Sequence, residues 1–152
     1  MPNWNLYDTF RKKQIAGDSA SVLDLDTLTL KCMVVTSGYT PNQNTHDFRD
    51  DLGATEVSGT NYTAGGNTLG SVTITMNGSG LVTVDSNDPA AWTAHASGFS
   101  NGRRAIIYVA RGGASTADEL IAYSDDFGAD KGNVGGDFSI VLDAAGIFTG
   151  PR

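Results

Sequence analysis

A pair of short alternating stretches around a glycine-rich turn constrains the fold most strongly. SVTITM (residues 71–76) and LVTVD (residues 81–85) each alternate apolar and polar side chains, and NGSG (residues 77–80) separates them. Alternation with a period of two is typical of a strand that buries one face. Asn-Gly between two such stretches indicates a tight reversal. The sequence therefore predicts a β-hairpin here.

Glycine is abundant and scattered, which indicates many turns. The chain of 152 residues contains 19 glycines, whereas average usage predicts roughly 11. Further strand candidates are TLTLKCMVV, RRAIIYVA, ELIAYSDDFG and DFSIVLDAAGIF, and THDFRDDLG is expected to form a short helical turn. Together these stretches predict a mainly β fold, which is an antiparallel β-sandwich or barrel-like domain with a short N-terminal helix.

The N-terminal segment carries the helical pattern. In NWNLYDTFRKKQIAGD, residues 3–18, apolar side chains recur every three to four positions, which predicts a helix. We therefore divide the chain into an N-terminal helical segment over residues 1–17 and a single β-rich domain over residues 18–152. A helix this short needs a surface to pack against. That surface is either its own domain, which we favour, or a partner.

Aromatic residues are concentrated in this N-terminal segment. Trp4, Tyr7 and Phe10 lie within seven positions of one another. Aromatic side chains are enriched in the cores of protein interfaces. These three residues are therefore the candidate interface, should the segment dock on a partner.

The residues that carry chemistry form no recognisable catalytic or metal-binding motif. The two histidines, His46 and His95, stand in polar stretches, and the single cysteine, Cys32, stands in an apolar strand-like run. The acidic pairs do not follow the spacing of a calcium-binding loop. Phosphate-binding glycine motifs, nucleophile elbows and zinc motifs are missing. We expect no catalytic residues, no metal, no cofactor and no enzymatic activity.

The glycine-rich stretch EVSGTNYTAGG, residues 56–66, is better explained by backbone geometry than by ligand binding. Gly59, Gly65 and Gly66 permit positive φ angles, which suits a structural turn. Tyr62 is expected to anchor this loop by its ring, with its hydroxyl group bonded to a partner at the surface.

The overall charge narrows the classes of partner. The formal net charge is −7, whereas sequence-independent binding to nucleic acid needs a cationic surface. No stretch approaches the roughly 20 apolar residues of a membrane span, and no signal peptide is evident. We expect a protein that is made in a cytoplasm and binds neither nucleic acid nor membranes.

Several stretches in a fixed order resemble a family of small tailed-bacteriophage virion proteins. They are LYDTFRKKQIAG, DTLTLKCMVVTSGYTP, VVTSGYTPNQNTHDFRDDLGATEVSGTNYTAGG, AIIYVA, LIAYSDDFG and FSIVLDAAGIFT, and they cover nearly the whole chain. The resemblance implies a non-enzymatic structural protein of the virion, made in the cytoplasm of the host bacterium. Within that group, the role we favour is head decoration, in which the protein cements the shell of the major capsid protein.

The resemblance also implies partners, and two other roles stay open. A decoration protein binds the major capsid protein or other virion proteins in many copies, and we expect a homo-oligomer, with a trimer favoured. The first alternative is a tail, neck or adaptor component of the same virion. The second is a carbohydrate-binding module for host attachment, which would need exposed aromatic residues. Trp92 is the candidate for such a residue, although a lone tryptophan more often fills a core or an interface.

Overall fold

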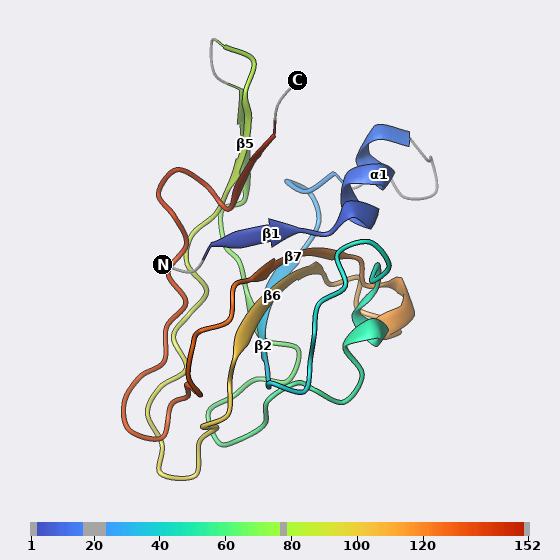
Figure 1. Ribbon diagram of the computed structural model, residues 1–152. Coiled ribbons are helices and arrows are strands. Elements are labelled where there is room, and N and C mark those ends of the chain that lie inside the picture. The colour runs from blue at the N-terminus through green and yellow to red at the C-terminus, as the bar shows by residue number, and fades with distance from the viewer. Residues whose placement is uncertain (1–2, 17–23, 77–78, 151–152) are drawn as a thin grey trace.

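Strands dominate the fold, and they form two antiparallel sheets (Figure 1). The computed structural model describes residues 3–16, 24–76 and 79–150. The larger sheet has five strands in the order β1 (Trp4–Leu6), β7 (Leu120–Ser124), β6 (Arg104–Val109), β2 (Leu30–Val35) and β3 (Asn67–Thr68). The smaller sheet has three strands in the order β4 (Thr73–Met76), β5 (Val82–Asp85) and β8 (Phe148–Gly150).

The helical elements are short. They are α1 (Asp8–Ala16) and the 3-10 helices η1 (Arg49–Leu52) and η2 (Ser115–Ala117). The predicted mainly β, antiparallel fold with one short N-terminal helix is therefore confirmed. Its two separate sheets are compatible with a sandwich-like domain and not with a closed barrel. None of the described helices has the length and the apolar character that crossing a membrane requires.

The core lies around the central strands of the five-stranded sheet. Consecutive residues of β2, β6 and β7 are buried, so both faces of these strands are covered. Strands of this kind read as continuous apolar runs rather than as alternation. LKCMVV, RAIIYV and LIAYS fit that description, and the strands expected from these runs are observed.

The N-terminal segment differs from its prediction. Helix α1 begins at Asp8, and residues 4–6 form strand β1 instead. In β1, Trp4 pairs with Ser124 of β7, and the backbone N–H of Asp125 donates to the carbonyl of Asn3 at 2.9 Å. The open edge of β7 would otherwise leave backbone groups unpaired, and this requirement overrides the local helical periodicity. The boundary expected between residues 17 and 18 falls in residues 17–23, outside the described residues.

The predicted hairpin is present as β4 and β5. Thr73 pairs with Asp85 and Met76 with Val82, in the register that the alternation requires, while residues 77–78 of the turn lie outside the described residues. Figure 1 shows this hairpin extending beyond the rest of the molecule, with β8 beside β5. We call residues 73–76 and 82–85 the arm, and we call the five-stranded sheet with its covering segments the body.

The last strand candidate is only partly a strand. In DFSIVLDAAGIF, strand β8 starts at Phe148, and the earlier part forms one isolated bridge, between Phe138 and Trp92. The strand prediction was wrong there, because the backbone N–H of Leu142 donates to the Asp88 carboxylate at 2.7 Å instead of to a neighbouring strand. An extended segment can thus be fixed by side chains and need not join a sheet.

Candidate functional site

The N-terminal aromatic residues lie mostly inside the protein. Tyr7 is fully buried and Phe10 is 4% exposed. The Tyr7 ring lies 5.0 Å from that of Tyr123, and the Phe10 ring lies 5.7 Å from that of Phe148. Two of the three candidate interface residues therefore help to fill the core, as expected for a segment that covers its own domain. Trp4, on the edge strand β1, is only half-buried and remains the candidate interface residue that a partner can reach.

A chain of hydrogen bonds connects this segment to the loop before η1. The hydroxyl groups of Tyr7 and Tyr39 lie 2.7 Å apart, and the Tyr39 hydroxyl lies 2.8 Å from Nδ1 of His46. The backbone N–H of Asn42 also donates to that nitrogen, so Nδ1 of His46 is an acceptor and the Tyr39 hydroxyl donates to it. Burial raises the pKa of Tyr39 to about 12. This histidine therefore has a structural role in joining two segments.

The loop at residues 56–66 is organised around Glu56 and Tyr62. Oε1 of Glu56 accepts from the Tyr62 hydroxyl at 2.9 Å and from the backbone N–H of Gly65 at 2.5 Å. The Tyr62 hydroxyl in turn accepts from the backbone N–H of Val34 at 3.1 Å, and burial raises the pKa of Tyr62. The expected surface partner for this hydroxyl is thus wrong: its partners are the β2 backbone and a carboxylate.

The three glycines of this loop serve two different purposes. Gly65 and Gly66 have φ angles of 82° and 75°, the conformation in which L side chains are strained. A Cβ atom on Gly66 would also collide with the carbonyl of Cys32 in β2. Gly59 does not have a positive φ. Instead, a Cβ atom there would lie 2.5 Å from the backbone nitrogen of Phe99, so this position needs glycine for close approach. The stretch is a structural turn.

The remaining reactive side chains are held in structural roles. Cys32 is fully buried, and burial raises the pKa of its thiol to about 12, so the thiol stays protonated at neutral pH. Nδ1 of His95 accepts from the backbone N–H of Ser97 at 3.0 Å. In residues 3–16, 24–76 and 79–150, no three His, Cys, Asp or Glu side chains gather closely enough to hold a metal ion.

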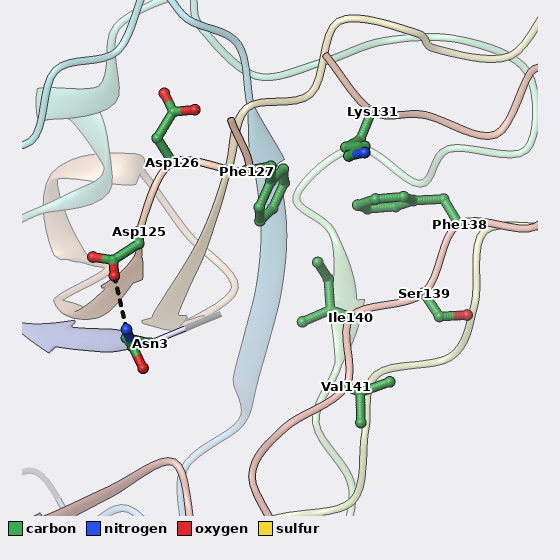
Figure 2. Close-up of a pocket in the computed structure, with 9 residues that line it drawn as sticks. All are labelled: Asn3, Asp125, Asp126, Phe127, Lys131, Phe138, Ser139, Ile140 and Val141. Atoms are coloured by element: carbon green, nitrogen blue, oxygen red, sulfur yellow. Dashed lines mark hydrogen bonds between the residues drawn. The ribbon is translucent and has the colours of Figure 1, made fainter. Parts of the chain in front are cut away.

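An open cleft of about 610 Å³ lies beside the end of β7, and Figure 2 shows the residues that line it. Nine residues from three parts of the chain line it: Asn3, Asp125, Asp126, Phe127, Lys131, Phe138, Ser139, Ile140 and Val141. Phe127 and Phe138 have their ring centroids 6.1 Å apart, and together with the buried Ile140 they form an apolar floor. Val141 lies at the cleft with 47% of its surface exposed.

The acidic residues of the cleft are bound by neighbouring groups. Asn3 and Asn5 donate to the two carboxylate oxygens of Asp125, at 3.1 and 2.8 Å. Arg103 donates to Asp126 at 2.7 Å, and this hydrogen bond is the main cause that lowers the pKa of Asp126. Because these carboxylates already have partners, what the cleft offers to a ligand is its apolar floor and the exposed side chain of Lys131.

The cleft also presents backbone groups without partners. Ser139 and Val141 lie in the extended segment after the Phe138 bridge, and within the described residues they make no hydrogen bond. Unpaired backbone groups along an extended segment are a template for pairing with another strand. The cleft therefore suits an extended segment that brings apolar side chains and a free strand edge.

No protein-family model, curated protein or solved structure compared with this chain matches it. Trp92 is 1% exposed, and its ring stacks 5.7 Å from that of Tyr62. It belongs to an aromatic cluster in the core and is not available to stack on a sugar.

Sequence reasoning missed the cleft, because it joins segments that are far apart along the chain. Asn3, Asp125 and Phe138 meet only after β1 has paired with β7. One signal was present in the sequence, since Phe138, Ile140 and Leu142 alternate with Ser139 and Val141. That alternation predicts one buried face and leaves Val141 on the outside.

Proposed function

We propose that this chain is a non-enzymatic structural protein of a tailed-bacteriophage virion, acting as a head decoration protein that binds the outside of the major capsid protein shell. The observation that carries the proposal is the arm. Two large apolar side chains, Ile74 and Met76, are 43% and 72% exposed on it. Exposed apolar surface on a folded domain marks a contact with another protein. The partner in that contact is another protein of the assembly, which includes other copies of this chain, and the sequence resemblance supports the virion as the place of that assembly.

The proposed role also fits the charge and size of the protein. A net charge of −7 favours solubility at high concentration, which a protein needed in many copies requires. Attachment to a symmetric shell multiplies weak contacts, so each subunit of an oligomer needs only a modest patch. We propose a homo-oligomer, with a trimer favoured, that adds to a preformed head.

Undecorated heads test this proposal directly. Purified protein is mixed with heads that lack it, the particles are sedimented, and bound copies are counted against the major capsid protein. Saturation at hundreds of copies per particle supports decoration. Saturation at about a dozen copies or fewer points to the alternative tail, neck or adaptor role, because those positions have low symmetry. Absence of binding would refute the decoration role.

Trp4 is the residue with which to begin mapping the shell contact. It is half-buried on an edge strand, so Trp4→Ala removes accessible aromatic surface while leaving Tyr7 and Phe10 in the core. We expect this variant to bind heads about tenfold more weakly. Ile15→Ala is the matched control, because Ile15 is 87% exposed at the end of α1. Equal binding by both variants would remove Trp4 from the shell contact.

A further inference from the structure

The arm has one apolar face that its own chain covers only in part. Residues paired across an antiparallel sheet share a face, so Ile74 lies beside Val84, and Met76 lies beside Val82. At the inner end, Val84 is 3% exposed, whereas at the outer end Met76 is 72% exposed. β4 is also an edge strand, and among the described residues its backbone pairs only with β5, which leaves its other side open.

Strand β4 of the arm is also free of charge. No Asp, Glu, Lys or Arg occurs from Val57 to Val84, although the chain as a whole carries a net charge of −7. Edge strands that avoid association usually carry charged residues, and lysine above all. An uncharged β4 with apolar side chains therefore lacks the usual protection against pairing.

The cleft has the complementary features. It is open, it has an apolar floor, and Ser139 and Val141 offer backbone groups without partners among the described residues. Its volume of about 610 Å³ lies within the roughly 300–1,000 Å³ of clefts that enclose ligands, so it has room for the side chains of one strand. The arm and the cleft are thus two apolar surfaces of the same molecule that its own chain leaves partly uncovered.

We propose that the arm of one copy docks in the cleft of a second copy, with Ile74 and Met76 placed on the apolar floor and β4 lying along residues 139–141. The contact is head to tail, because it joins two different surfaces. Such contacts close into rings when the rotation between copies allows it. The inference rests on the proposed function only in taking the protein to be a homo-oligomer, and it needs no shell.

Charge argues for a second copy as the occupant. Two copies of an acidic protein repel each other through most of their surfaces. Strand β4, which has no charged residue, is a part that can approach Asp125 and Asp126 at the cleft without bringing a further negative charge. A segment of this chain that was itself acidic could not do so.

Sedimentation equilibrium of the purified protein tests the proposal. We expect self-association below about 1 mM, the concentration at which even a contact with a Kd of that size is half-formed. Met76→Asp in the arm and Val141→Asp in the cleft should each weaken association by about ten- to a hundredfold, since each loses apolar burial and adds a negative charge. A wild-type protein that stays monomeric would overturn the proposal.

Matched controls separate the two faces. Thr75→Asp adds the same charge to the same strand on the opposite face, and Thr75 is also exposed. Val134→Asp adds it at a valine that is 44% exposed outside the cleft. Both controls should associate as the wild type does. Thermal melting checks folding, and Met76→Thr and Val141→Thr replace any aspartate variant that fails to fold.

Mixing the two variants decides the geometry. In a head-to-tail contact, the intact arm of Val141→Asp can enter the intact cleft of Met76→Asp, so the mixture should form dimers that neither variant forms alone. Pairing of arm with arm predicts that Val141→Asp associates normally, which would overturn the proposal. These measurements use no heads, so failure of self-association is distinct from failure to decorate.

Discussion

The body and the arm are both antiparallel sheets, but they differ in what covers them. In β6 of the body, Ala105 to Val109 are all buried, and successive residues cover both faces. In β4 of the arm, all four residues are exposed. The same strand-forming chemistry therefore gives a stable centre in one place and an accessible surface in the other.

The difference shows which buried surfaces supply the free energy of folding. Apolar burial stabilises a strand roughly in proportion to the area removed from water. The body gains this on both faces of its central strands, whereas the arm gains it only near Val84, at its inner end. Helix α1 accounts for part of that cover, because the Phe10 ring contacts the Phe148 ring of β8. The outer end of the arm contributes little to stability, so its sequence is free to serve contacts.

The largest expected effect compares the same substitution in the two sheets. Ile107→Ala in β6 removes a fully buried side chain and should lower the free energy of unfolding by about 3–4 kcal/mol. Ile74→Ala in β4 should cost less than about 1 kcal/mol, because 43% of Ile74 is already exposed. Urea denaturation of the two variants measures both values. Equal costs would show that the arm carries as much of the stability as the body.

A second comparison concerns the backbone of the body. Gly66→Ala places a Cβ atom against the Cys32 carbonyl of β2 at a positive φ, and we expect a cost of about 2–3 kcal/mol. Gly112→Ala is the matched control, because its φ is 76° and nothing lies within 4 Å of its Cβ position. Backbone strain from the positive φ alone should lower the free energy of unfolding of that variant by about 1 kcal/mol. Similar melting temperatures for the two would mean that close approach to β2 adds nothing.

A third comparison lies within the arm. Val84 and Val82 stand on one face of one strand, but Val84 is 3% exposed and Val82 is only partly buried. Val84→Ala should lower the free energy of unfolding by about 2 kcal/mol, and Val82→Ala should lower it by less than about 1 kcal/mol. Urea denaturation again provides the measurement. A larger cost at Val82 would place the stabilising contacts at the outer end and would count against an arm reserved for contacts.

Local sequence patterns predicted the strands that are buried on both faces or that alternate between two faces. The hairpin of β4 and β5 follows from alternation, and β6 follows from a continuous apolar run. The sequence did not predict β1, because Trp4 to Leu6 become a strand only through the free edge of β7. It also misassigned residues 138–142, where the Asp88 side chain takes the backbone N–H of Leu142. Pairing between distant segments has no local signal.

The candidate site was predictable to a smaller extent. Gly65 and Gly66 were identified as turn residues, and positive φ angles are observed at both. Tyr7 and Phe10 were offered as interface residues, but their aromatic character equally suits the core, and burial in the core is where the structure places them. Composition alone does not distinguish a buried aromatic residue from an exposed one. The cleft needs Asn3 and Phe138 brought together, which only the tertiary fold provides.

The smallest effect concerns the tyrosines, which occur in the body and not in the arm. The Tyr108 hydroxyl donates to the carbonyl of Gly65 at 2.7 Å, and burial raises the pKa of Tyr108 from 10 to about 12. A raised pKa means that folding favours the protonated hydroxyl. This contribution is therefore complete below pH 10 and is lost as the pH rises towards 12.

We expect Tyr108→Phe to lower the free energy of unfolding by about 1 kcal/mol at pH 7 through the lost hydrogen bond. Between pH 10 and 12 this variant should lose less stability than the wild type. Urea denaturation across that range measures both effects. Tyr123→Phe is the control for the hydrogen bond at pH 7, because the half-buried Tyr123 hydroxyl makes no hydrogen bond within the described residues. If Tyr108→Phe and the wild type lost stability in parallel above pH 10, the alkaline sensitivity of the body would have to come from its other tyrosines, with Tyr39 the first to substitute.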